Sequence, residues 1–154
     1  MYGNPGGYFY SSTDGTNFTR HSPPIYSGTT AGNVGRIEIE PSPTNANKFY
    51  ILLQDYADGA EIYLTTDKFS STTKLNEPSA TDTGIAATDF TRGQSGYDLE
   101  IETDPSNENI VYVGGIDLFR SANGGTSWEQ MSKWSNNNDM AALNVAIVLS
   151  LIHI

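Results

Sequence analysis

The chain has 154 residues, with 18 acidic and 8 basic side chains and a formal net charge of −10. This length fits one ordinary domain, and the acidity argues against a nucleic-acid partner or an anionic membrane surface, because both require a basic footprint. The absence of cysteine excludes disulfides, thiol nucleophiles and thiolate metal sites. No apolar run approaches the ~20 residues of a membrane-spanning helix, so we expect no membrane insertion.

The composition favours strands and turns. Ser, Thr, Asn and Gly are abundant, and 9 Tyr and 6 Phe add strand propensity. In chain order, we expect a pair of strands within residues 7–21. Two sets of four strands follow, at 36–40, 48–54, 61–66 and 72–76, and then at 98–102, 110–114, 117–121 and 128–133. Residues 143–148 have the pattern of the first strand of a further set.

The two sets of strands are copies of one repeat. Residues 37–40 (Ile-Glu-Ile-Glu) align without a gap over residues 99–102 (Leu-Glu-Ile-Glu), 62 residues later, and Tyr50 falls on Tyr112 at the same offset. Four-strand units that recur at such a spacing are typical of β-propellers. The predicted fold is therefore all-β, a partial β-propeller of four-stranded antiparallel blades, with about two fuller blades and parts of two others.

A second pattern ends the third strand of each unit. It consists of Ser or Thr, then Asp, Asn or Thr two positions later, then Gly and an aromatic residue. The copies are Ser121, Asn123, Gly125 and Trp128; Ser11, Thr13, Gly15 and Phe18; and the shorter Thr65 and Asp67. Such side chains accept backbone hydrogen bonds within tight turns, and Gly permits a positive φ. We expect Trp128 to be mostly buried beneath its hairpin and Phe18 to hold the matching place.

These turns resemble the Asp-box, or BNR, repeat of sialidase-like and sortilin-like β-propellers, whose usual form is Ser-x-Asp-x-Gly-x-x-Trp. The resemblance covers roughly residues 7–134. It implies that the turns lie on the rim of the propeller, away from the ligand face, and that their residues are structural. It also implies an arginine cluster, a Tyr/Glu pair and an early Arg-Ile-Pro motif in a sialidase, but that motif is absent from this sequence.

A propeller closes a ring of about 4–8 blades, so we expect the chain to be part of a larger ring. Residues 1–147 are predicted to form an incomplete Asp-box propeller that packs against further blades of its parent chain. The ending Ser-Leu-Ile-His-Ile resembles a translated sequencing adapter, so residues 148–154 are expected to be a non-native tail.

The candidate catalytic residues are the glutamates of the first strand in each set, Glu38, Glu40, Glu100 and Glu102. Each pair shares one face of its strand, and paired carboxylates are what glycoside hydrolysis uses. The alternative is that they face solvent or bind the backbone of a neighbouring blade. We favour this alternative, because a repeated Glu-x-Glu is architectural whereas a catalytic acid is usually needed once.

We expect no metal or cofactor. The acidic loop 55–61 offers oxygen ligands for Ca²⁺ but lacks EF-hand spacing, and a solvated hairpin loop is its ordinary interpretation. His21 stands alone, so neither a zinc site nor a Ser-His-Asp triad is predicted. Tyr56, Tyr97 and Trp134 can stack on sugar rings, although aromatic residues between blades more often pack.

Two classes of function stay open. The first is a non-catalytic binding or scaffold segment of a secreted bacterial propeller, at the cell surface or outside the cell, that binds a glycan or a protein. The second is part of a glycoside hydrolase, either sialidase-like or similar to the two-propeller glucanases that cut xyloglucan. We predict the first, with no catalytic residue in this chain, because the turn motifs are imperfect and the sialidase motif is missing.

Overall fold

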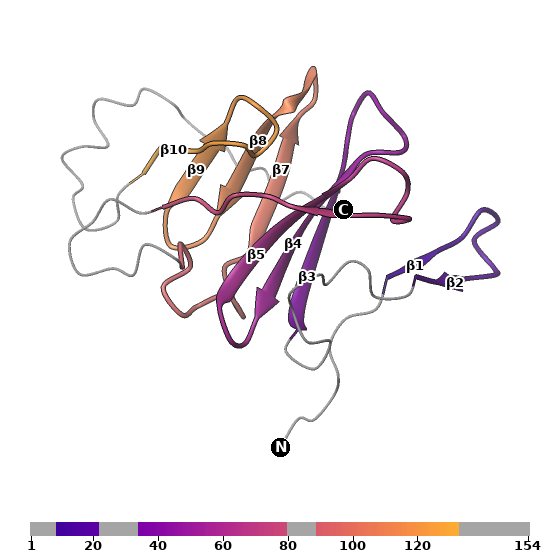
Figure 1. The fold of residues 1–154 in the computed structure, drawn as a ribbon, viewed down its shortest axis with the longest axis horizontal. Helices are drawn as coiled ribbons and strands as arrows, with labels where there is room; N and C mark the ends of the chain where they lie inside the picture. The colour runs from indigo at the N-terminus through magenta and orange to yellow at the C-terminus, as the bar shows by residue number, and fades with distance from the viewer. Residues whose placement is uncertain (1–8, 22–33, 80–88, 133–154) are drawn as a thin grey trace.

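The computed structural model describes residues 9–21, 34–79 and 89–132, and these ranges are all β-strand, turn and loop, with no helix (Figure 1). The strands are β1 (Tyr10–Ser11), β2 (Thr19–Arg20), β3 (Val34–Pro41), β4 (Phe49–Asp55), β5 (Gly59–Thr65), β6 (Thr73–Lys74), β7 (Glu100–Asp104), β8 (Asn107–Gly114), β9 (Leu118–Ser121) and β10 (Glu129–Gln130). Across these residues no helix is long and apolar enough to cross a membrane.

Eight of the strands form two four-stranded antiparallel sheets, in the orders β3-β4-β5-β6 and β7-β8-β9-β10. Each strand therefore pairs with the next one along the chain, as the sequence predicts. The register repeats as well: Glu40 pairs with Tyr50 in the first sheet, and Glu102 pairs with Tyr112 in the second. This equivalence confirms the repeat at an offset of 62 residues.

The fourth strand of each set is shorter than predicted, since β6 and β10 have two residues each. One further backbone bond extends each pairing, from Leu75 N–H to the carbonyl of Ile62 and from Met131 N–H to that of Leu118. The strand predicted at 143–148 and the tail at 148–154 lie outside the described residues.

The main apolar core lies between the two sheets. Tyr50, Leu52 and Ile62 contribute from the first sheet, and the second sheet contributes residues such as Ile101 and Val113. Tyr50 and Ile51 alternate across β4, and both are fully buried because the sheet is covered on both faces. The first strands β3 and β7 lie near each other (Figure 1). This is the arrangement of neighbouring propeller blades, so the fold is a partial β-propeller.

A third, two-stranded piece packs on the other face of the first sheet. Strands β1 and β2 pair antiparallel, and Phe9 beside them joins a second core with Val34, Ile51, Leu53 and Tyr63. The Phe69 ring stacks on Phe9, with ring centroids 5.4 Å apart. The predicted pair of strands within residues 7–21 is thus present, and it stands beside the first sheet (Figure 1).

Candidate functional site

The two glutamates of β3 lie toward the second sheet. The Oε1 atom of Glu40 accepts hydrogen bonds from Thr103, from its backbone N–H at 3.1 Å and from its hydroxyl at 2.8 Å. Glu38 instead pairs with Arg36, whose Nε lies 2.7 Å from Glu38 Oε1. Because Thr103 belongs to β7, Glu40 links the first strands of two neighbouring sheets, as the architectural interpretation of Glu-x-Glu requires.

Glu100 and Glu102 occupy the equivalent places in the second sheet. Side chains alternate along a strand, and Thr103 faces the first sheet, so these two glutamates project from the opposite face. Both are half-buried. The four candidate carboxylates therefore do not converge on one site, because the second sheet itself separates the two pairs.

The turn between β9 and β10 has the hydrogen bonds expected of its motif. Ser121 Oγ accepts from the N–H of Asn123 at 3.2 Å and of Gly125 at 2.8 Å. Asn123 Oδ1 in turn accepts from Ser127 N–H at 2.9 Å. Gly125 has a φ of 86°, which explains its place in the motif.

The turn between β5 and β6 has the same bonds, although its sequence keeps only half of the motif. Thr65 Oγ1 accepts from the N–H of Asp67 and Phe69, and Asp67 Oδ1 accepts from Ser71 N–H at 2.8 Å. Lys68 and Phe69 take φ values of 54° and 66°, where the other turn has two glycines. Sequence analysis missed these two residues because neither is glycine.

The first turn is displaced by one residue from its prediction. Ser12 Oγ accepts from Gly15 N–H at 2.8 Å, and Asp14 Oδ1 accepts from Asn17 N–H at 2.8 Å, so Ser12 and Asp14 take the roles expected of Ser11 and Thr13. Ser11 Oγ instead lies 2.7 Å from His21 Nε2.

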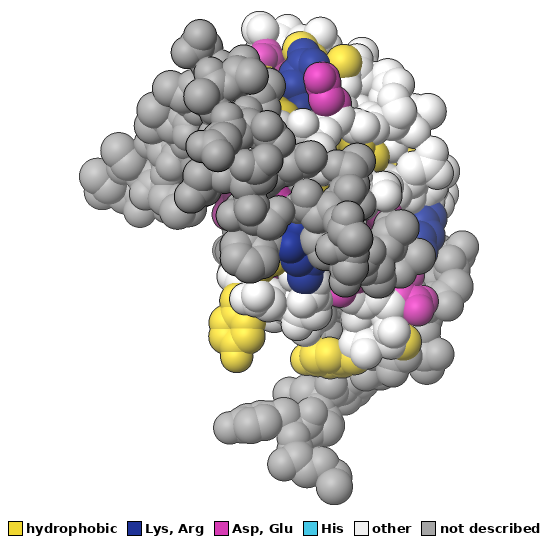
Figure 2. All heavy atoms as spheres, turned by 90° about the vertical axis from the view of Figure 1, so that its left-hand side faces the viewer, with side chains coloured by type: hydrophobic (Ala, Val, Ile, Leu, Met, Phe, Trp, Pro, Cys, Tyr) yellow, Lys and Arg dark blue, Asp and Glu magenta, His cyan; other side chains and the backbone are white. Residues whose placement is uncertain are grey.

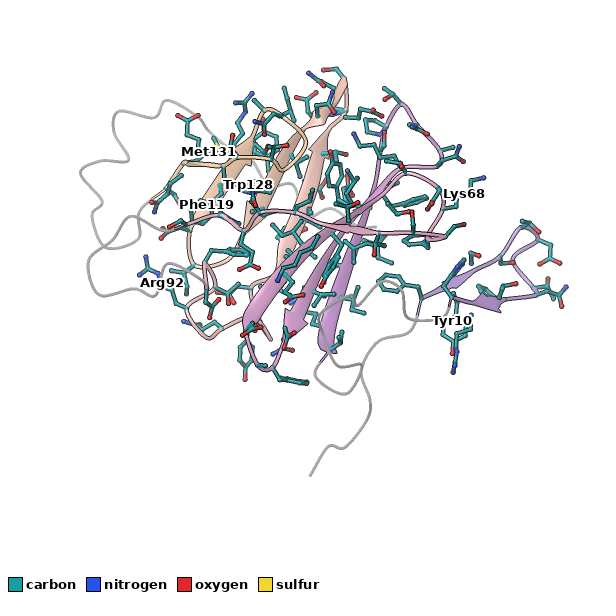
Figure 3. All side chains as sticks on the ribbon, viewed as in Figure 1. Tyr10, Lys68, Arg92, Phe119, Trp128 and Met131 are labelled. Carbon is teal, nitrogen blue, oxygen red and sulfur yellow. The ribbon has the colours of Figure 1, made fainter. Side chains whose placement is uncertain are left out.

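The two aromatic positions of the motif differ from each other. Phe18 is 63% exposed, so its predicted match to a buried place is wrong. Trp128 is partly buried and packs against the main core, in line with its prediction, and its indole Nε1–H donates to the carbonyl of Asn76 at 2.7 Å. Asn76 Nδ2 donates back to the carbonyl of Thr126 at 2.7 Å. Trp128 thus ties its turn to the segment that follows β6 (Figure 3).

Hydrogen bonds hold the acidic residues of these turns in their ionised form. The backbone N–H of Asn17 is the main cause that keeps the pKa of Asp14 well below its usual value, and the hydroxyl of Ser71 has the same effect on the pKa of Asp67. These hydrogen bonds lie within the turns themselves and stabilise them.

A cavity of about 660 Å³ lies at the opposite end of the sheets. In Figure 1 the β3–β4 and β7–β8 turns lie at the upper end, whereas the β4–β5 loop and residues 89–99 lie at the lower end. The cavity is lined by residues 54–59 of that loop, by Lys74 and Glu77, and by Asp89, Gly93 and Ser95. Four carboxylates and one ammonium therefore line it.

Lys74 organises the charges around this cavity. Its Nζ lies 2.8 Å from Glu61 Oε1 and 3.3 Å from Glu77 Oε1. Burial lowers the pKa of Lys74, but the hydrogen bond and the charge of Glu61 outweigh this and raise it above its usual value. Burial, supported by the charges of Glu61 and Asp58, raises the pKa of Glu77. The cavity thus combines a half-buried carboxyl with a raised pKa and a charged lysine.

Oxygen atoms of Asp55, Asp58 and Glu61 lie within 4.8 Å of one another, which is the grouping behind the calcium alternative. Glu61, however, already binds Lys74 through Oε1 and the Tyr63 hydroxyl through Oε2. The lysine ammonium takes the place that a cation would need. The group is therefore better described as a carboxylate–lysine cluster than as an oxygen cage for Ca²⁺.

Two exposed tyrosines belong to the same end of the molecule. Tyr56, on the β4–β5 loop, is 66% exposed, and Tyr97, in the 89–99 segment, is 85% exposed. Figure 2 shows hydrophobic side chains exposed at this lower edge. The loop lies so close to Asp89 that a Cβ at Gly59 would overlap the Asp89 carboxylate. Exposed Tyr56 thus borders the charged cavity.

The sequence predicts part of this site, namely loop 55–61, Tyr56 and Tyr97. It does not predict Lys74, Glu77 and Asp89. Lys74 and Glu77 lie three residues apart, in β6 and just after it, whereas Asp89 comes from a separate segment, so no short motif joins them to loop 55–61. His21 lies elsewhere: its ring is tilted against the Phe69 ring, and its Nε2 lies 2.7 Å from Ser11 Oγ.

No protein-family model and no curated protein matches this sequence. Among solved structures, the chain is similar to a GH74 enzyme of Niastella koreensis. The two share 22% sequence identity with a TM-score of 0.47, over 67% of this chain and 15% of that chain. The chain thus spans about a seventh of the length of that enzyme's chain.

Proposed function

We propose that this chain is a segment of a secreted Asp-box β-propeller protein, located outside the cell or at its surface, that binds a glycan without catalysing its cleavage. The observation that carries the proposal is the cavity at one end of the sheets, bordered by exposed Tyr56 and lined by carboxylates and Gln54. Sugar rings stack on aromatic faces while their hydroxyls hydrogen-bond to carboxylate and amide groups, and this cavity presents both kinds of group.

The placement of the Glu-x-Glu pairs supports the non-catalytic part of the proposal. Glu40 is bound to Thr103 and Glu38 to Arg36, so a structural role accounts for the presence of both carboxylates. The Asp-box assignment is supported by the shared bonds of the β5–β6 and β9–β10 turns.

A titration of the full chain with a panel of oligosaccharides tests the proposal. Isothermal calorimetry should show saturable binding of at least one of them, and Tyr56→Ala should weaken it roughly tenfold, because an aromatic contact of this kind is worth more than 1 kcal/mol. The matched control is Tyr10→Ala, since Tyr10 is similarly exposed but lies far from the cavity on β1 (Figure 3). Equal losses in both variants, or no binding at all, would refute the assignment.

The second candidate function, part of a glycoside hydrolase, is favoured by Glu77. A carboxyl whose pKa is raised by burial and by neighbouring acidic groups is the pattern of a general acid. Release of reducing sugar by the parent protein, lost by about 10²–10⁴-fold in Glu77→Gln with binding retained, would establish catalysis and overturn the non-catalytic proposal.

A further inference from the structure

Equivalent faces of the two sheets are covered to different extents. In and just before the second sheet, four apolar side chains that face the first sheet are at most 4% exposed, namely Leu99, Ile101, Val111 and Val113. The residues 62 positions earlier are Ile37, Ile39, Phe49 and Ile51. Ile51 is fully buried, but Ile39 is 44% exposed. A large aliphatic side chain that is buried in one repeat is therefore left bare in the other.

The second sheet is covered by strands β3, β4 and β5 of its neighbour, and the first two of these also make hydrogen bonds to it. Glu40 on β3 and Tyr50 on β4 bind Thr103 and the carbonyl of Glu108. Beside the first sheet, the described residues supply only β1 and β2. The turn that joins β1 to β2 uses the same kinds of acceptor, a hydroxyl and a carboxylate, as the turns between third and fourth strands, although each bond spans three residues rather than four. The strands equivalent to β3 and β4 are thus the ones that this third sheet lacks within the described ranges.

The residues on the Ile39 face determine which side chains the strands that cover it can have. Pro41 takes the position of Thr103 and has neither an N–H nor a hydroxyl, so a carboxylate placed there like Glu40 would be buried without a donor. Ala46 takes the position of Glu108, to which Lys48 is paired in the existing interface. A lysine in the equivalent place would have no partner.

We propose that the surface formed by Ile37, Ile39, Pro41 and Phe49, together with the edge of β1 that does not pair with β2, binds a two-stranded antiparallel β-hairpin. This hairpin completes the β1–β2 sheet to four strands and is apolar, rather than acidic, at the position that faces Pro41. Backbone pairing with β1 provides affinity, and the apolar contact with Ile39 provides specificity. The inference is independent of the proposed glycan site, which lies at the end of the sheets.

A labelled peptide with the sequence of residues 36–55, the β3–β4 hairpin, serves as the probe for the full chain in fluorescence anisotropy. We expect saturable binding, and we expect a peptide with Glu40→Val to bind at least about tenfold more tightly, because it no longer buries a carboxylate against Pro41. The chain variants Ile39→Lys and Ile39→Thr should weaken binding of both peptides. Tyr97→Lys is the control, because Tyr97 is exposed at the other end.

Three results would overturn the proposal: no saturable binding of either peptide, binding of the unmodified peptide that equals or exceeds that of Glu40→Val, or equal losses in the Ile39 and Tyr97 variants. Sedimentation velocity of the chain alone tests whether a second copy of the chain covers this face instead. Concentration-dependent dimers that Ile39→Lys abolishes would show that a second copy covers this face, which also contradicts the proposal.

Discussion

Replacing Glu40 by Ala should destabilise the protein far more than the same change at Glu38. Glu40 accepts two hydrogen bonds from Thr103, which is only 9% exposed. A hydrogen bond to a charged group contributes about 1.5–3 kcal/mol, and the buried N–H loses its acceptor in the variant. We therefore expect Glu40→Ala to lower the free energy of unfolding by about 3 kcal/mol.

Two companion variants separate this effect from a general effect of charge. Glu40→Gln keeps an acceptor oxygen and should cost about 1 kcal/mol. Glu38→Ala removes a pair whose side chains are 35% and 37% exposed, so it should cost at most about 1 kcal/mol. Urea unfolding followed by far-UV circular dichroism measures all three. The link between sheets would be refuted by a loss below about 1 kcal/mol in Glu40→Ala, or by an equal loss in Glu38→Ala.

Three further changes address the turns and the cavity. Trp128→Ala should lower the free energy of unfolding by about 3 kcal/mol, the lower end of the range for large aromatic residues, because Trp128 is half-buried. Trp128→Phe should lower it by about 1 kcal/mol, because the hydrogen bond to Asn76 is lost. Equal losses in the two variants would contradict a role for the indole N–H. Lys68→Gly should stabilise the fold by about 0.5–1 kcal/mol, since its φ of 54° is strained for any residue with a Cβ, and a loss of stability in urea unfolding would disprove the strain. In the folded protein the pKa of Glu77 lies above its usual 4.5, so the contribution of Glu77 to stability declines as the pH rises above that value. The free energy of unfolding of Glu77→Gln minus that of the parent should therefore increase between pH 4 and 7. A difference that stays constant over this range would argue against the raised pKa.

The repeat could be read from the sequence because its signal is local and occurs twice. Alternating apolar and acidic residues fix the strand and its faces, and the matching register of Ile39 with Ile51 and of Ile101 with Val113 follows from that alternation. What the pattern could not predict is burial. Tyr50 is fully buried whereas its equivalent Tyr112 is only half-buried, because Tyr50 faces the second sheet and Tyr112 faces away from the first.

In the turns, the sequence motif does not fully predict which residues make the hydrogen bonds. The frame of the first turn depends on whether the Ser11 or the Ser12 hydroxyl points into it, and adjacent serines leave that choice open. In the second turn, the signal was present in Thr65, Asp67 and Ser71, which share their spacing with Ser121, Asn123 and Ser127. The hydroxyl and carboxylate acceptors define this turn more reliably than glycine does, because neighbouring contacts can hold Phe69 at a positive φ.

The aromatic contacts of Phe69 explain how such strain persists. Its ring lies 4.8 Å from that of Phe49 and 5.4 Å from that of Phe9, which joins β5–β6 to the β1–β2 piece. Lys68 N–H donates to the carbonyl of Asn47, as the equivalent Gly124 N–H donates to that of Asn109. Packing and this backbone bond together hold a conformation that the residue types alone disfavour.

The acidity of the chain is largely structural, and this decides which carboxylates can serve a ligand. Asp14 and Asp67 accept backbone N–H groups within turns, and Glu40 and Glu108 join the two sheets. A carboxylate with such a role cannot change partners without cost to the fold. Around the cavity, Lys74 is the residue that pairs with Glu77 within the described ranges, and its side chain is partly solvent-exposed, so Glu77 can exchange that partner for a ligand at lower cost. Substitution of Glu77 should therefore alter binding more than folding, whereas substitution of Glu40 should do the reverse.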